Sequence, residues 1–210
     1  LDLHYETILD WPTFDTWLDK IKSAAVVALD TETTSLVETR ATLVGISFCI
    51  EPGESAYLPL MHRYPGAPDQ LPLADVLLRL KPYLEDPIHI KLGQHIKYDR
   101  HVFANHAIEV KGYAHDTMLQ SYVIEAHKPH NLASLAERHL HKKGTSYEDL
   151  CGKGAHQIGF DQVDLKIATD YAAEDADITL RLHLELWPQI QESPGLLYIY
   201  EKVEMPAMRV

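Results

Sequence analysis

Cysteine and long apolar runs are both scarce in this sequence. Its two cysteines, Cys49 and Cys151, lie far apart and form no CxxC pair, which argues against a disulfide framework and against a thiolate metal site. No apolar run approaches the roughly 20 residues that a membrane-spanning helix needs, and neither a basic region nor an apolar signal segment follows Leu1. We therefore expect a cytoplasmic protein that makes no contact with a membrane.

Basic residues are also in short supply. The 210 residues include 19 Lys and Arg against 31 Asp and Glu, which gives a net charge of -12. This balance argues against a protein that grips a long duplex through many phosphates. It leaves room for a protein that takes a short strand end, because metal ions can hold such an end with few basic side chains. With 46% hydrophobic residues the chain can build one sizeable core, so we expect one domain and a monomer.

Two acids follow a strongly apolar stretch within Ala24–Leu36, AAVVALDTETTSL. The apolar residues at its start predict a buried central strand over Ala24–Thr31. Because side chains alternate across a strand, Asp30 and Glu32 share one face at its end. Like charges beside a core are costly unless a cation compensates them, and paired oxygen donors suit a hard divalent cation.

Alternating apolar segments predict the rest of a mixed sheet. Four further strands are expected, at Leu43–Ile50, Ala56–Leu60, Ile88–Gln94 and Tyr113–His115. The first three strands of the five read as an antiparallel meander, and Ile8 is expected in a short edge strand. Helical spacing predicts helices over Asp15–Lys22, Leu73–Leu84, Leu132–Leu140 and Asp164–Gln191, with others beginning near His95 and at Asp116. The predicted fold class is therefore α/β, a mixed five-stranded sheet flanked by helices.

Two more acids belong to other elements. Asp99 lies near a strand-to-helix junction, where functional residues are common in α/β folds. On the last long helix, one stripe contains Tyr171 and Asp175 together with apolar residues. Asp175 is therefore expected to face inward without a basic partner, whereas Asp177 and Arg181 lie off the stripe and are expected to be solvated. The four acids together match a two-metal nuclease.

Three segments carry a family resemblance. LDTETTSL, GQHIKYDRHVFAN and YAAEDADITLRLHLELWP resemble the three motifs of the proofreading 3'-5' exonuclease domain of bacterial DNA polymerase I, in the tyrosine subclass of the DEDD exonuclease superfamily. The similarity covers almost the whole chain and implies a ribonuclease H-like fold. Residues 195–210, GLLYIYEKVEMPAMRV, resemble the lead-in to the polymerase domain. The resemblance thus implies an exonuclease domain over residues 1–193 and, over residues 194–210, the start of a connection to a covalently linked polymerase domain.

The resemblance also implies roles for individual residues. Asp30, Glu32, Asp99 and Asp175 would be catalytic ligands of two divalent metal ions, Mg²⁺ or Mn²⁺, with Zn²⁺ as an alternative at one site. Tyr171 would orient the attacking water. The implied activity is the metal-dependent removal of nucleotides from single-stranded or frayed DNA 3' ends, which is proofreading.

Six further residues are implied to contact the substrate. Leu36, Tyr98 and Phe160 would lie against the strand end. Gln94 and Arg138 would lie near phosphates. The sixth, His95, stands where the family usually has Asn, so it keeps the ability to form hydrogen bonds but adds a titratable group.

Two other functions remain open. Some relatives of polymerase I keep this fold without the carboxylates, so one alternative is a catalytically inactive structural domain; the presence of all four acids argues against it. A 3'-5' exoribonuclease of the same superfamily is the other, and the polymerase-like C-terminal segment favours DNA. Asp116 is interpreted as a helix N-cap rather than as a fifth metal ligand.

Overall fold

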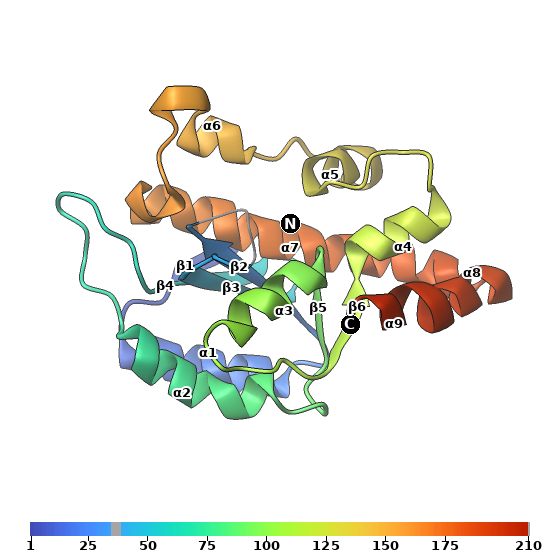
Figure 1. Ribbon diagram of the computed structural model, residues 1–210, viewed down its shortest axis with the longest axis horizontal. Coiled ribbons are helices and arrows are strands. Elements are labelled where there is room, and N and C mark those ends of the chain that lie inside the picture. The colour runs from blue at the N-terminus through green and yellow to red at the C-terminus, as the bar shows by residue number, and fades with distance from the viewer. Residues whose placement is uncertain (35–38, 210) are drawn as a thin grey trace.

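A mixed six-stranded sheet forms the centre of the computed structural model, which describes residues 1–34 and 39–209 (Figure 1). The strands are β1 (His4–Thr7), β2 (Val27–Thr33), β3 (Leu43–Glu51), β4 (Glu54–Pro59), β5 (Lys91–Gly93) and β6 (Tyr113–Asp116). Their order across the sheet is β1-β4-β3-β2-β5-β6. The α/β class and the mixed sheet agree with the prediction. The predicted number of five strands is one too low, because the short edge strand β1 also joins the sheet, parallel to β4.

The strand order places β2 inside the sheet, as predicted for the central strand. β2 pairs antiparallel with β3 and parallel with β5, and β3 pairs antiparallel with β4, so the predicted meander is present. The strand runs to Thr33 and therefore includes both Asp30 and Glu32. Asp30 lies opposite Ser47 and Glu32 opposite Gly45 on β3. This pairing fixes the face of the sheet from which the two carboxylates project.

Helices cover both faces of the sheet. One face packs against α1 (Trp11–Ser23) and α2 (Leu73–Leu84), and the long helix α7 (Leu165–Gln191) crosses the other face (Figure 1). The other α-helices are α3 (Ile96–Ala104), α4 (Thr117–Ile124), α5 (Leu132–Leu140), α6 (Tyr147–Cys151), α8 (Pro194–Ile199) and α9 (Met205–Ala207). Among the described residues, no helix has both the length and the apolar character that crossing a bilayer requires.

Alternation along β2 divides its side chains between two cores. Val27 and Leu29 belong to the core under α1 and α2, whereas Ala28 packs with Leu92 and with Ala176 of α7. Asp30 and Glu32 follow Ala28 at a spacing of two, so they also project toward α7. The strand therefore delivers two carboxylates beneath a helix that it already contacts.

Small residues let α7 lie close to the sheet. Ala168, Ala172 and Ala176 are fully buried at intervals of four, which places them on one face of the helix. The apolar part of the predicted stripe is confirmed farther along, where Ile178 and Leu182 are buried. Short side chains at this contact leave room for a polar group between the helix and β2.

A second side of α7 is covered as well, and the prediction that Asp177 is solvated is wrong. Its carboxylate is fully buried and forms an ion pair with Arg181 at 2.8 Å. It also accepts hydrogen bonds from the Tyr5 hydroxyl (2.5 Å) and from the Gly53 N–H (2.9 Å). The edge strand β1 and the turn between β3 and β4 supply these donors, and a helical projection of α7 alone gives no sign of them.

Candidate active site

Three carboxylates meet between β2 and α7. Ligand oxygens of Asp30, Glu32 and Asp175 all lie within 4.8 Å of one another. β2 supplies the first two from the face toward α7, and the helix supplies the third from the run of small residues between Ala172 and Ala176. Asp175 thus faces β2, as its position on the helical stripe predicts. Residues 145 positions apart in the sequence come together in this way because the helix crosses the strand end.

The fourth predicted ligand, Asp99, comes from the first turn of α3. β5 ends at Gly93, His95 adopts a left-handed conformation (φ 63°), and the helix begins at Ile96. Asp99 is 1% exposed, and one of its oxygens accepts hydrogen bonds from the Thr31 N–H (3.2 Å) and the Thr31 hydroxyl (2.5 Å). It lies beside β2, but its carboxylate is held against the strand rather than within the group of three.

Burial raises the pKa of all four carboxyl groups, and repulsion by neighbouring carboxylates adds to the effect for Glu32, Asp99 and Asp175. Burial raises the pKa of Asp30 to about 7. Burial also raises the pKa of Glu32 well above its usual range, and the charges of the other three carboxylates add to the effect. For Asp99 and Asp175, burial raises the pKa first and the charge of Asp30 second. The four groups therefore resist losing their protons together as long as no cation lies among them.

The donor set fits a divalent metal ion. The three atoms that converge are all carboxylate oxygens, which Mg²⁺ and Mn²⁺ prefer to nitrogen or sulfur ligands. No ion pair between described residues involves any of the four carboxylates, so no Lys, Arg or His there offsets their repulsion. A dication would supply the missing positive charge.

Tyr171 lies one helical turn before Asp175, as predicted. Its side chain is half-buried, and a hydrogen bond between its hydroxyl and Asp175 partly offsets the raised pKa of that carboxyl. Burial, followed by the charges of Asp175 and Glu32, raises the pKa of Tyr171 far above its ordinary value. The hydroxyl therefore keeps its proton and remains a hydrogen-bond donor at the edge of the carboxylate group.

Two of the residues predicted to contact substrate lie at the start of α3, and one cannot be placed. The Tyr98 hydroxyl is hydrogen-bonded to the Thr33 hydroxyl at the end of β2. The exposed His95 ring lies with its centroid 6.4 Å from that of Tyr98. Leu36 falls outside the described residues.

Gln94 and Arg138 are both engaged by the segment that joins α4 to α5. The Gln94 side-chain amide donates to the His130 carbonyl at 2.8 Å. Arg138 donates through Nε to Glu125 at 2.9 Å, and its guanidinium also reaches the Pro129 carbonyl at 3.1 Å. In this structure the side-chain N–H groups of Gln94 and Arg138 thus donate to other protein groups, whereas the sequence analysis expects both residues near phosphates.

Phe160 is a core residue in this structure. Its side chain is fully buried, and its ring packs against Tyr57 and Tyr171 with centroid distances of 6.2 and 5.8 Å. Unless the structure rearranges, the buried Phe160 side chain cannot contact the end of a nucleic-acid strand. Its position supports Tyr171 from behind, which is a packing role that the sequence alone did not indicate.

Tyr147, at the start of α6, is a site residue that the sequence analysis missed. It lines a cavity of about 190 Å³ together with Tyr171 and Asp175. Its ring stacks on Phe160 with a centroid distance of 6.4 Å. Burial raises the pKa of Tyr147 most, and the charges of Cys151 and Glu32 add to the effect. The available signal was an aromatic residue directly after Ser146, which caps the helix. The surrounding stretch has no apolar periodicity, so the sequence gives no sign that Tyr147 lies beside the carboxylates.

Comparison with known sequences identifies the family. The family model for the 3'-5' exonuclease domain of DNA polymerase A matches residues 5–191, which is most of the chain. The chain belongs to this 3'-5' exonuclease family. DNA polymerase I of Pseudomonas aeruginosa is 46% identical over 212 residues, which span 100% of this chain and 23% of the relative. DNA polymerase I of Rhizobium leguminosarum is 39% identical over 98% of the chain and 22% of its own length. The chain thus spans about a quarter of the polymerases that it matches.

Solved structures of low sequence identity share the fold of this exonuclease domain. The POL domain of Pol1 from M. smegmatis superposes with a TM-score of 0.72 and 17% identity, over 97% of this chain and 30% of the other. Escherichia coli RNase D, described as an exoribonuclease involved in structured RNA processing, superposes with a TM-score of 0.69 and 18% identity, over 99% of this chain and 50% of the other. These neighbours agree with the ribonuclease H-like class inferred from the sequence.

Proposed function

We propose that this exonuclease domain removes nucleotides from single-stranded or frayed DNA 3' ends by metal-dependent hydrolysis. The observation that carries the proposal is the convergence of Asp30, Glu32 and Asp175 within 4.8 Å, where no described Lys, Arg or His forms an ion pair with them. Similarity to two DNA polymerase I sequences over nearly the whole chain supports DNA as the substrate. The fold shared with RNase D makes an exoribonuclease the second candidate.

The chain's own residues would hold two divalent ions. Asp30, Glu32 and Asp175 would bind one of them, and Asp99 would join Asp30 to bind the other, since the two charges already interact. Ions bound there would supply a water of lowered pKa and would stabilise charge on the attacking and leaving oxygens. Thr31 binds only one of the two Asp99 oxygens, so the other oxygen would be the ligand of this ion.

Tyr171 would act as a donor rather than as a base. Its raised pKa keeps the phenol protonated, so once the Tyr171 hydroxyl leaves its hydrogen bond with Asp175 it can donate one to the attacking oxygen and hold that oxygen in line. Tyr98 and His95 would meet the strand end, because both lie at the start of α3, next to the carboxylate of Asp99. We retain Leu36 as a proposed contact at the terminal base.

The proposed domain boundaries follow the same comparison. We propose that residues 1–193 are the exonuclease domain and that residues 194–210 begin the connection to a covalently linked polymerase domain. The match of the family model to residues 5–191 supports the first boundary. The relatives, of which the chain spans 22 to 23%, support the presence of further domains.

The direct test is digestion of a single-stranded DNA labelled either at its 3' end or at its 5' end, with Mg²⁺ and with EDTA. We expect the 3' label to appear at once as a mononucleotide, and the 5' label to move down a ladder of shorter strands, only when Mg²⁺ is present. Cleavage in EDTA, or immediate release of the 5' label, would contradict the proposal.

A matched RNA strand decides between the two candidate functions. Faster cleavage of DNA supports the polymerase-linked nuclease, and faster cleavage of RNA supports the exoribonuclease. Absence of cleavage of both, in a protein that is folded and saturated with Mg²⁺, would instead favour the inactive structural domain.

A further inference from the structure

The start of α3 is fixed by a buried aspartate outside the carboxylate group. Asp116, at the end of β6, is fully buried. Its two oxygens accept hydrogen bonds from the backbone N–H groups of His95 (3.0 Å) and Ile96 (2.9 Å). It also caps α4, as predicted. Asp99 lies in the first turn of α3, so the hydrogen bonds of Asp116 to the start of that helix also affect the position of the Asp99 carboxylate.

One hydroxyl of the C-terminal segment holds Asp116 in turn. This segment, Pro194–Arg209, contains α8, the π-helical turn Tyr200–Glu204 and α9. Tyr200 is 1% exposed, and its oxygen accepts hydrogen bonds from the Asp116 N–H (3.1 Å) and from the Gln120 side-chain amide (3.3 Å). Tyr200 therefore contacts Asp116, whose side chain binds the N–H groups at the start of α3, although Tyr200 lies 84 positions farther along the chain.

Among the described residues, the acceptor left for the proton of the Tyr200 hydroxyl is Nδ1 of His115 at 3.1 Å. Burial lowers the pKa of His115 to about 4, so the ring is neutral and can accept. The two rings are also stacked, with a centroid distance of 6.0 Å and an angle of 5°. A hydroxyl offers one donor and two acceptor positions, and all three are filled. Such a saturated contact fixes the Tyr200 oxygen in one place.

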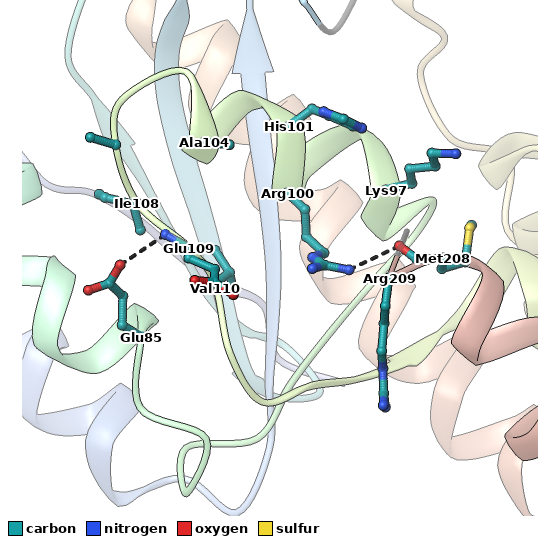
Figure 2. Close-up of a pocket in the computed structure, with 11 residues that line it drawn as sticks. Glu85, Lys97, Arg100, His101, Ala104, Ile108, Glu109, Val110, Met208 and Arg209 are labelled. Carbon is teal, nitrogen blue, oxygen red and sulfur yellow. Dashed lines mark hydrogen bonds between the residues drawn. The ribbon is translucent and has the colours of Figure 1, made fainter.

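A second bond joins the same segment to the body of α3. Arg100, the residue after Asp99, donates to the Met208 carbonyl at 3.0 Å, at a cavity of about 460 Å³ (Figure 2). Lys97 and Arg209 also line this cavity, but Figure 2 shows their side chains pointing away from each other, so they do not form a convergent anion site. The C-terminal segment thus contacts α3 in two ways. Tyr200 binds Asp116, which binds the start of the helix, and the Met208 carbonyl binds Arg100, the residue after Asp99.

We propose that Tyr200 is a positioning residue for the metal site: through Asp116 it fixes the first turn of α3, and with it the carboxylate of Asp99. Arg100 supports the same turn from the other side. The C-terminal segment is therefore part of the support of the nuclease site and not only a connector. This inference rests on the proposed function, because it presumes that Asp99 binds metal.

The test compares Tyr200→Phe with Tyr198→Phe, which makes the same chemical change on a side chain that is 64% exposed in the same segment. Amide hydrogen exchange at His95 and Ile96 is measured without metal, and Mn²⁺ binding is measured by calorimetry. We expect Tyr200→Phe to speed exchange at both amides about tenfold and to weaken Mn²⁺ binding by about tenfold, the lower end of the range for residues behind a metal ligand. Tyr198→Phe should match the wild type in both.

A folded Tyr200→Phe variant with wild-type exchange and wild-type Mn²⁺ affinity would overturn the proposal. If Tyr200→Phe fails to fold, the same measurements are made on Arg100→Gln, with Arg209→Gln as its control. Faster exchange and weaker Mn²⁺ binding in Arg100→Gln alone support the role of the C-terminal segment, and wild-type values for both overturn it. Absence of Mn²⁺ binding by the wild type would defeat the proposed function itself. The exchange rates, which need no metal, then still show whether Tyr200 holds the start of α3, so the two failures can be told apart.

Discussion

Among single residues, Asp175 is expected to have opposite effects on activity and on stability. Its pKa is raised by burial and by the charge of Asp30, so the metal-free protein carries this carboxylate at a cost. We expect Asp175→Asn to lower the cleavage rate about 100-fold or more, about 3 kcal/mol in the barrier, while leaving the melting temperature in EDTA unchanged or raised. Steady-state rates and a thermal melt measure the two effects. Full activity in the folded variant would remove Asp175 from the site.

Tyr171→Phe is the milder change at the same place. It removes only a hydroxyl that positions the attacking oxygen, so we expect a loss of about tenfold, within the range for one oriented hydrogen bond. The ring stays packed on Phe160, and the fold should not change. The same kinetic assay measures it, and a loss as large as that of Asp175→Asn would mean that Tyr171 does more than orient.

Asp30 gives the metal-free protein a defined pH dependence. Its pKa is raised from 3.8 to about 7 in the folded state, which therefore binds the proton more tightly than the unfolded state. The stability that this group contributes is present below about pH 4 and is lost as the pH rises through about 7. In EDTA, we expect the unfolding free energy to fall between pH 4 and 8 more in the wild type than in Asp30→Asn, by a few kcal/mol as an order of magnitude.

Urea unfolding at several pH values measures this difference. The comparison with Asp30→Asn is needed because His115 and His183, whose pKa values burial lowers from 6.5 to about 4, give stability the opposite slope below pH 6.5. That histidine contribution is common to both proteins and cancels. If the unfolding free energies of the two proteins change in parallel with pH, the pKa of Asp30 is not raised in the folded state.

At the scale of elements, the periodic signals placed most of the site. A spacing of two put Asp30 and Glu32 on one face of β2, and a spacing of four put Asp175 on the inner face of α7. Those signals say nothing of side chains whose partners come from distant loops. The hydrogen bonds of Asp99 to Thr31 and the burial of Phe160 both depend on such tertiary contacts, so the sequence could not predict them.

His95 illustrates how an element boundary can explain a residue type. It caps α3 in a left-handed conformation, φ 63°, which Asn and His adopt several times more readily than most residues. Both the Asn that the family usually has and the His found here can therefore adopt this left-handed conformation. This accounts for the substitution without any contact to substrate.

The end of α2 depends on a buried lysine that the pattern of β5 did not reveal. Lys91 has no exposed surface, and its ammonium donates to the carbonyls of Tyr83 (2.7 Å), Asp86 (3.0 Å) and Lys111 (2.9 Å). Lys91→Met would remove three hydrogen bonds to backbone carbonyls in a buried place, so we expect a loss of about 3 kcal/mol in the free energy of unfolding. Urea denaturation measures it, with exposed Lys22→Met as the control. Equal losses in both would contradict this role.

At the scale of the whole molecule, the acidic balance limits how nucleic acid can bind. With a net charge of -12, few phosphates can be neutralised, so we expect the Asp175→Asn variant in EDTA to bind single strands weakly. The slope of log affinity against log salt should be shallow, about -1 to -2. Fluorescence anisotropy across a salt series measures it. Tight duplex binding with a steep slope would instead implicate a basic surface, for which the cavity lined by Lys97, Arg100 and Arg209 is the first place to look.

The four carboxylates between β2, α3 and α7 are expected to bind divalent ions. The most direct measurement is anomalous diffraction from crystals soaked in Mn²⁺. We expect two Mn²⁺ ions roughly 4 Å apart, one bound by Asp30, Glu32 and Asp175 and the other by Asp30 and Asp99. Crystals that hold Mn²⁺ elsewhere, or none at this site at saturating concentration, would contradict the account.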